Sequence, residues 1–125
     1  MKIFGIVPAR FESTRFPGKP LADINGKTMI QRVFEQCRKS ERLSQIIVAT
    51  DDERILNHVK DFGGDAILTS PQHLSGTDRC AEIIEKIGME TCDAVINIQG
   101  DEPYIHPEQI NLLCTTFDNN IRFRS

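Results

Sequence analysis

The strongest constraint on the fold is an alternation of short apolar runs with longer amphipathic runs, repeated four times along the 125 residues. The short runs are rich in Ile, Val and Ala, which is typical of buried strands. The longer runs place apolar residues three or four positions apart, which is typical of helices that cover a sheet. We therefore expect an α/β fold with a mostly parallel sheet, helices on both faces and right-handed crossovers. The predicted strands are Lys2–Val7, Gln45–Thr50, Asp65–Thr69 and Ala94–Gln99.

Capping signals indicate where the predicted helices begin and end. Two pairs have capping-box spacing, with a Thr three residues before Gln or Glu: Thr28 with Gln31, and Thr50 with Glu53. Gly63-Gly64 is expected to end the second helix in a left-handed C-cap. Pro107, followed by Glu108, is expected to open a last helix that extends to about Phe117. The predicted buried faces of the first three helices are Met29, Ile30, Val33, Phe34 and Cys37; Ile55, Leu56, Val59 and Phe62; and Cys80, Ala81, Ile83, Ile84 and Ile87.

Charge is distributed unevenly along the chain. Residues 1–50 carry nine Lys and Arg against four Asp and Glu (net +5), and residues 51–125 carry six against fourteen (net −8), which together give −3. A basic first half suits an anionic ligand, and the acidic remainder argues against a broad nucleic-acid surface. With 39% apolar and 26% charged residues, the composition is that of an ordinary soluble domain.

The sequence contains no long apolar segment. Its longest apolar runs, such as Phe4–Ala9 and Ile46–Ala49, are too short to cross a bilayer, and the first residues lack the features of a signal peptide. We therefore expect a cytoplasmic protein without a membrane partner, in which residues 1–125 form one domain. The cysteines are widely separated and lack zinc-ligand spacing, so we expect reduced thiols: Cys37, Cys80 and Cys114 on buried helix faces, and Cys92 at a strand edge.

A basic loop follows the first predicted strand, at the edge of the sheet where parallel α/β folds bind ligands. Its three cations, Arg10, Arg15 and Lys19, can meet phosphate oxygens through planar donor forks and a compact point charge. Gly18 allows close approach of the backbone. The loop has neither the Walker pattern nor the Gly-x-Gly-x-x-Gly pattern of the common nucleotide sites. Charge alone leaves a polyphosphate site and a solvated basic loop equally open.

The order of residues in this loop is more specific than its charge. Residues 8–21 read Pro-Ala-Arg-x-x-Ser-Thr-Arg-x-Pro-Gly-Lys-Pro-Leu, which resembles the signature loop of bacterial CMP-Kdo synthetases (3-deoxy-manno-octulosonate cytidylyltransferases). Four further segments resemble that family in the same order: Asp23–Lys27, Ile47–Asp51, His73–Arg79 and Asn97–Pro103. The likeness covers nearly all of residues 1–117. It implies a Rossmann-like nucleotidyltransferase fold.

The resemblance implies a role for residues in several of these segments. The residues that would bind the CTP triphosphate are Arg10, Arg15 and Lys19. The residues that would frame the cytosine are Pro8, Ala9, Ser75, Gly76 and Arg79. Gln99 would lie near the ribose and the incoming sugar, and Asp101 would be a ligand of an essential Mg²⁺. None of His58, His73 and His106 is assigned to catalysis.

Two of these segments also have a purely structural interpretation. Gly-Asp-Glu-Pro at residues 100–103 would form a tight turn whatever its function, and taken alone Asp101 is better explained as a turn residue. Beside the phosphate loop and the family resemblance, we favour the metal role. Ser75 and Asp78 have the spacing of a helix cap, which is compatible with base recognition because Gly76 exposes its backbone at the same point.

The reaction that the resemblance implies is attack of the anomeric C2 hydroxyl of Kdo, an acidic eight-carbon sugar, on the α-phosphorus of CTP. Pyrophosphate leaves, and the product CMP-Kdo serves lipopolysaccharide assembly. Such catalysis consists mainly of in-line positioning and of neutralising charge on the triphosphate. Family members are homodimers that continue well beyond 125 residues, so we expect this chain to carry the CTP-binding half without most of the sugar pocket or a second metal-binding aspartate.

Alternative interpretations remain within and outside this family. The nearest enzyme alternative is another sugar nucleotidyltransferase, such as a CMP-sialic acid synthetase, although Ser13-Thr14-Arg15 with Pro17-Gly18-Lys19-Pro20 favours Kdo. The alternative from another class is a catalytically inactive nucleotide-binding fragment. A downstream aspartate in the native gene would distinguish an active enzyme from such an inactive fragment.

Overall fold

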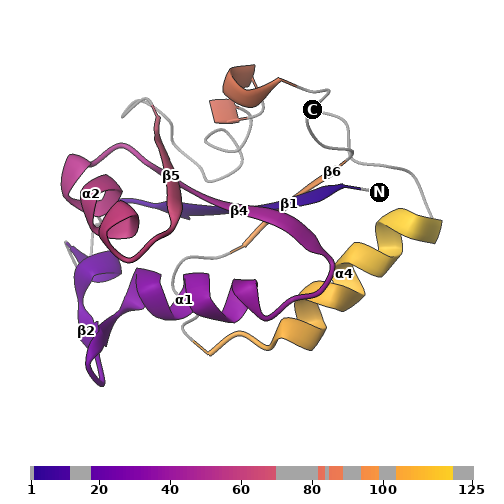
Figure 1. Ribbon diagram of the computed structural model, residues 1–125, viewed down its shortest axis with the longest axis horizontal. Helices are drawn as coiled ribbons and strands as arrows, with labels where there is room; N and C mark the ends of the chain where they lie inside the picture. The colour runs from indigo at the N-terminus through magenta and orange to yellow at the C-terminus, as the bar shows by residue number, and fades with distance from the viewer. Residues whose placement is uncertain are drawn as a thin grey trace.

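The computed structural model describes residues 2–11, 18–69, 82–83, 85–88, 94–98 and 104–119. A central sheet is flanked by helices (Figure 1). The strands are β1 (Ile3–Ala9), β2 (Asp23–Ile24), β3 (Lys27–Thr28), β4 (Leu43–Thr50), β5 (Asp65–Leu68) and β6 (Ala94–Asn97). The helices are the 3₁₀ turn η1 (Lys19–Leu21), α1 (Met29–Arg38), α2 (Glu53–Asp61) and α4 (Pro107–Asn119), and residues 82–83 and 85–87 are also helical.

The main sheet has the order β5-β4-β1-β6, and all three of its strand pairs are parallel. Ala9 lies opposite Thr50, so β1 and β4 end together. At the other end of this pair the register is irregular, because Ile3 pairs with Leu43 but Phe4 pairs with Gln45. The expected parallel sheet is confirmed, and its carboxyl ends share one edge.

The sheet divides the apolar core into two clusters. On one face, alternate residues of β1, β4 and β6 pack against α1, α2 and α4. The buried helix residues in this cluster are Ile30, Val33, Phe34, Cys37, Ile55, Val59, Ile110 and Cys114. On the other face, residues of β1, β4 and β6 pack around Ile83, with Ile87 partly buried against them. Helices therefore cover both faces, as the alternating pattern predicts.

Most of the predicted apolar faces are buried. All five residues predicted for α1 are buried, and so are Ile55 and Val59 of α2 and Ile83 of the third helix. Leu56 and Phe62 are only partly buried. Cys37 and Cys114 are buried free thiols, and burial raises the pKa of Cys37 to about 12. Cys80, Ala81, Ile84 and Cys92 lie outside the described residues.

The predicted strand and helix ends need correction at several points. β1 extends two residues past Val7, because Pro8 and Ala9 still pair with Ala49 and Thr50. Proline fits there because it lies beyond Ile6, the last β1 residue that pairs with β6. The other corrected ends are Leu43 for the start of β4, Leu68 for the end of β5, Asn97 for the end of β6 and Asn119 for the end of α4. The predicted start of α4 at Pro107 is confirmed.

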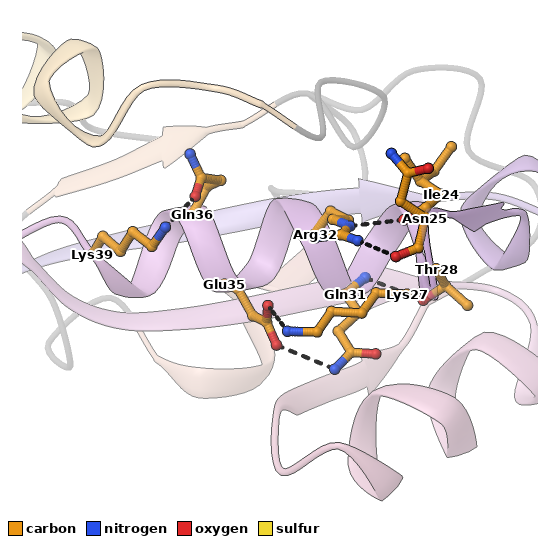
Figure 2. A network of polar contacts seen from close by, with 9 residues as sticks. All are labelled: Ile24, Asn25, Lys27, Thr28, Gln31, Arg32, Glu35, Gln36 and Lys39. Carbon is orange, nitrogen blue, oxygen red and sulfur yellow. Dashed lines mark hydrogen bonds and ion pairs between the residues drawn. The ribbon is translucent and has the colours of Figure 1, made fainter.

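A small hairpin between η1 and α1 was not predicted. Its turn residues Asn25 and Gly26 have φ angles of 53° and 95°, as a type I′ turn requires. Arg32 of α1 donates from Nε to the carbonyl of Ile24 (2.9 Å) and from Nη2 to the carbonyl of Asn25 (2.7 Å), which holds the hairpin against the helix (Figure 2). Asn-Gly is a strong hairpin signal, so the sequence did contain this element.

The two predicted N-caps have different outcomes. Thr28 is the N-cap of α1, and its Oγ1 accepts from the backbone N–H of Gln31 (3.3 Å). The Gln31 side chain donates to Glu35 instead of completing a capping box (Figure 2). The prediction of Thr50 as the second cap is wrong. Thr50 is the fully buried last residue of β4, and Asp52 caps α2.

The end of α2 agrees better with the sequence. Gly63 has a φ of 87°, the left-handed conformation expected after α2, and Gly64 donates its N–H to the carbonyl of Val59 (2.9 Å). Across the described part of the chain, no helix is both long enough and apolar enough to span a membrane.

Candidate nucleotide-binding site

The candidate site lies at the carboxyl edge of the sheet, where β1 ends. Pro8 and Ala9, predicted to begin the basic loop, are the last residues of β1, and Ala9 is buried. Arg10 is therefore the first residue beyond the strand, and it is exposed. Lys19 is the first residue of η1 and is half-buried. Both described cations of the predicted phosphate loop thus lie next to the sheet edge that binds ligands in such folds.

The basic loop is closed at its base. Gly18 donates its N–H to the carbonyl of Phe11 (2.6 Å), so the chain returns to its starting point after six intervening residues. Gly18 has a φ of 75°, and a Cβ added there would lie 3.1 Å from Cε2 of Phe11. Glycine is therefore needed for both its conformation and its lack of a side chain. The closure places Arg10 and Lys19 one residue outside each end of the loop.

A short helical turn connects this closure to α1. Leu21 donates its N–H to the carbonyl of Gly18 (2.9 Å), and Ala22 donates to the carbonyl of Lys19 (3.0 Å). Met29 then donates to the carbonyl of Ala22 (2.9 Å). The buried Pro20 packs η1 onto the body of the domain. The C-terminal end of the loop is consequently fixed to the helix that follows it.

The end of β4 contributes a second polar group to the same edge. Asp52 Oδ1 accepts from the backbone N–H of Arg54 (2.8 Å) as the cap of α2. The Arg54 side chain returns to this carboxylate, with Nε 3.1 Å from Oδ1 and Nη2 2.7 Å from Oδ2. These side-chain hydrogen bonds hold the pKa of Asp52 below its ordinary value, although desolvation opposes them. The Arg54 guanidinium lies 3.4 Å above the ring centroid of Phe11.

Sequence reasoning missed Phe11, Asp52 and Arg54. An aspartate two residues after the last strand residue, directly before a helical run, is an ordinary N-cap signal, and it was overlooked because Thr50 matched the capping-box spacing. The contact between Phe11 and Arg54 joins residues far apart in the sequence. Only the in-register ends of β1 and β4 bring them together.

The remaining predicted site residues lie outside the described part of the chain. They are Arg15, Ser75, Gly76, Arg79, Gln99 and Asp101. Within the described ranges, no group of three or more His, Cys, Asp or Glu side chains could hold a metal ion. The structure therefore brings together the strand end, Arg10 and Lys19, and leaves the predicted base, ribose and metal contacts as predictions.

An open hollow of about 490 Å³ lies elsewhere on the surface, lined by Lys39, Glu41, His106, Pro107, Glu108 and Asn111. It lies between the end of α1 and the start of α4, beside the amino end of β4. Its lining mixes acidic and basic side chains, which does not favour a polyphosphate. The carboxyl edge of the sheet is the better candidate for an anionic ligand.

A parallel α/β sheet with a basic loop after its first strand is the arrangement found in the nucleotide-binding domains of nucleotidyltransferases, and comparison with known proteins places the chain in that class. Residues 4–123 match the model of the cytidylyltransferase family, and the chain belongs to this family. Solved structures share the fold at lower identity. A cytidylyltransferase from Leptospira borgpetersenii aligns over 97% of this chain and half of its own, with a TM-score of 0.80 at 24% identity.

More similar proteins carry a more specific name. The 3-deoxy-manno-octulosonate cytidylyltransferase of Parabacteroides distasonis is 62% identical over 94% of this chain, and that of Bacteroides thetaiotaomicron is 56% identical over 95%. A solved CMP:2-keto-3-deoxy-manno-octonic acid synthetase complexed with CTP aligns over 96% of this chain and 48% of its own, with 43% identity and a TM-score of 0.91. The chain spans about half the length of the curated relatives that it matches: 45% of the first and 46% of the second.

Proposed function

We propose that this chain is the CTP-binding part of a 3-deoxy-manno-octulosonate cytidylyltransferase. The observation that carries the proposal is the closed basic loop at the carboxyl edge of the sheet, with Arg10 and Lys19 next to its two ends. It is supported by 43% identity to a synthetase that was solved in complex with CTP. The proposed unit is a single nucleotide-binding domain over residues 1–125.

The triphosphate is the part of CTP for which the described residues make the strongest case. Arg10, Arg15 and Lys19 would supply donors to its oxygens, the arginines as planar forks and the lysine as a point charge. Since Arg10 follows a buried strand end and Lys19 lies in a half-buried turn, the backbone of these two residues is fixed before the ligand arrives. Such pre-organisation lowers the entropy lost on binding.

The base and the sugar would lie to either side of these phosphates. The cytosine would meet the end of β1 at Pro8 and Ala9, together with Ser75, Gly76 and Arg79 from the segment before the third helix. Gln99, two residues beyond Asn97 at the end of β6, would lie near the ribose and the incoming sugar. Since parallel strands end at one edge, these three segments start from the same side of the sheet.

For Mg²⁺ we propose Asp101 as the protein ligand. The donor type fits, because Mg²⁺ usually takes one or two carboxylates together with phosphate oxygens. Asp101 follows β6, whose parallel pairing with β1 directs its carboxyl end toward the same edge as Arg10. A bound ion would neutralise charge on the phosphate oxygens. CTP titration with Mg²⁺ or with EDTA, in wild type and Asp101→Asn, tests this assignment.

In the full-length enzyme, the C2 hydroxyl of Kdo would attack the α-phosphorus of CTP while the bond to the β-phosphate oxygen breaks. The hydroxyl proton is lost, and CMP-Kdo and pyrophosphate are released. Arg10, Arg15 and Lys19 would hold the departing pyrophosphate and offset its charge, which is the main contribution expected in phosphoryl-transfer chemistry. We further propose a cytoplasmic homodimer that supplies CMP-Kdo to lipopolysaccharide assembly.

The test is calorimetric titration of CTP with Mg²⁺ into the chain, with ATP as the competing nucleotide. Arg15→Ala is expected to weaken CTP binding by about tenfold to a hundredfold, the usual cost of losing a charged hydrogen-bonding partner. The matched control is Lys39→Ala, which removes an exposed cation beyond the far end of α1. Equal binding of ATP and CTP, or no CTP binding by the folded chain, would refute the proposal. Kdo-dependent pyrophosphate release, with sialic acid as the competing sugar, tests the full-length reaction.

A further inference from the structure

We infer that Arg54 is a positioning residue that fixes the base of the phosphate loop through Phe11. The inference rests on the proposed CTP site for its functional meaning, and on the described contacts alone for its structural part. It concerns three residues that the basic motif does not specify: Phe11, Asp52 and Arg54.

The contacts form one continuous chain from α2 to the loop. Asp52 fixes the Arg54 guanidinium through two parallel hydrogen bonds, at 3.1 Å and 2.7 Å. The central carbon of the guanidinium lies over the Phe11 ring, 3.4 Å from its centroid. Phe11 in turn contacts Gly18, and its carbonyl accepts the Gly18 N–H at 2.6 Å. The two described residues that flank segment 12–17, Phe11 and Gly18, are therefore held against each other.

An arginine is required at this position for two reasons. Only a guanidinium can make a planar double hydrogen bond to Asp52 and present a flat cationic face to an aromatic ring at the same time. The Arg54 side chain is 60% exposed, whereas the Asp52 side chain is only 16% exposed. The carboxylate is thus the anchored partner, and the arginine extends from it over Phe11.

The same geometry argues against Arg54 as a phosphate ligand in its own right. Its charge is already opposed by the Asp52 carboxylate at 2.7 Å, which weakens its attraction for a further anion. Arg10, the residue before Phe11, is exposed beyond the end of β1. Arg54 therefore acts on the triphosphate through the position of the loop, by lowering the ordering cost that CTP binding must overcome.

Two readouts test the inference, and the first needs no nucleotide. Hydrogen exchange of the Gly18 amide reports directly on its bond to Phe11. The second readout is the CTP dissociation constant with Mg²⁺. The variants are Arg54→Gln, Arg54→Lys and Phe11→Leu, with Phe11→Tyr as the conservative rescue. The matched control is Lys60→Gln, an exposed cation in the last turn of α2.

Arg54→Gln, Arg54→Lys and Phe11→Leu are each expected to speed Gly18 exchange and to raise the CTP dissociation constant by about twofold to fivefold. Phe11→Tyr and Lys60→Gln should resemble wild type. The double variant of Arg54→Gln with Phe11→Leu should be no worse than either single change, because both remove the same contact. This non-additivity distinguishes positioning from direct binding, in which Phe11→Leu would leave CTP affinity intact.

The inference is overturned if Gly18 exchange in Arg54→Gln matches that in Lys60→Gln, or if the losses in CTP affinity are additive. It is overturned equally if Arg54→Lys preserves affinity while Phe11→Leu has no effect, which would make Arg54 a simple phosphate ligand. If Arg54→Gln speeds Gly18 exchange but the wild-type chain binds no CTP, the positioning contact is supported and the proposed nucleotide site is refuted. The two failures are therefore distinguishable.

Discussion

The first turns of α1 and α2 are capped by different chemistry. At α1, the hydroxyl of Thr28 accepts from Gln31 and is hydrogen-bonded to Nε2 of His58 on α2, at 2.6 Å. At α2, the carboxylate of Asp52 accepts from the backbone and from the side chain of Arg54. The first cap is uncharged at its centre and half-buried between two helices. The second is charged and extends to the edge of the sheet.

This difference separates stability from ligand binding. His58 packs edge-on against Phe62 (5.3 Å between centroids), and Phe62 packs edge-on against Phe34 (5.4 Å), so the α1 cap belongs to the helix-packing side of the domain. The α2 cap leads through Arg54 to Phe11 and the phosphate loop. Changes at Thr28 should therefore appear in the free energy of unfolding, and changes at Asp52 should appear also in CTP affinity.

The largest effect is expected from Phe34→Ala, which removes the buried ring that both helices share. A large-to-small change of this kind costs about 3–5 kcal/mol. The free energy of unfolding, measured by urea denaturation, should fall by that amount. Both caps should be lost in the same transition. Leu112→Ala is the control, because that side chain is 68% exposed on α4. A loss below about 1 kcal/mol for Phe34→Ala would mean that the helices are held mainly by their caps.

Thr28→Ala should have a smaller effect that remains confined to stability. Loss of the cap is expected to lower the free energy of unfolding by about 1–2 kcal/mol. Thr28→Ser keeps the hydroxyl and should retain most of this stability. CTP affinity in calorimetry should stay at the wild-type value for both variants. A clear loss of CTP affinity in Thr28→Ala would erase the distinction between the two caps.

The Asp52 cap should respond to acid in a way that the Thr28 cap does not. Hydrogen bonds from Arg54 lower the folded-state pKa of Asp52, so its contribution to stability is complete above the ordinary value of 3.8 and is lost as the pH falls through the lowered pKa. Asp52→Asn keeps a capping oxygen and removes the charge. The difference in unfolding free energy between wild type and Asp52→Asn should shrink below pH 3.8, whereas the difference for Thr28→Ala should stay constant there. If the difference in unfolding free energy between wild type and Asp52→Asn does not change with pH, the charge of Asp52 has no role in the cap.

The smallest effect is expected from Lys27→Ala. Lys27 lies beside the α1 cap and pairs with Glu35 at 2.8 Å, with the two side chains 44% and 34% exposed (Figure 2). Exposed pairs of this type contribute less than about 1 kcal/mol. Urea denaturation should therefore detect a change of at most a few tenths of a kcal/mol. A loss as large as that of Thr28→Ala would show that charge, and not only cap geometry, holds the start of α1.

Sequence patterns predicted the sheet and its helices because each followed one dominant local signal. The buried face of α1 appeared as a 3.6-residue periodicity, and Gly63 as a left-handed C-cap. The second cap failed because Thr50 and Asp52 are both good capping residues, and only strand pairing decides between them. The pairing of Thr50 with Ala9 and Leu68 extends β4 to that residue and leaves Asp52 free to cap.

At the candidate site, the sequence identified the charged residues but not what holds them. Arg10 and Lys19 could be predicted because cations after a buried strand suit an anionic ligand. The contact of Phe11 with Arg54 could not, because it joins two strand ends whose alignment depends on the register of the whole sheet. A periodic pattern specifies which face of a strand is buried, but not which residues of a neighbouring strand stand opposite.

The aligned ends of β1 and β4 make the site dependent on chain length as well as residue type. Each strand residue advances the chain by about 3.3 Å and turns its side chain to the opposite face. Deleting one residue from Ile46–Thr50 would therefore move Asp52 back along the strand by the length of one residue. It would also turn the β4 side chains on one side of the deletion to the opposite core cluster. The far end of the strand already accommodates one extra residue, Ser44, between the partners of Ile3 and Phe4. Insertions and deletions should consequently be accepted near Leu43 and rejected near Thr50, even where substitutions at both ends are harmless.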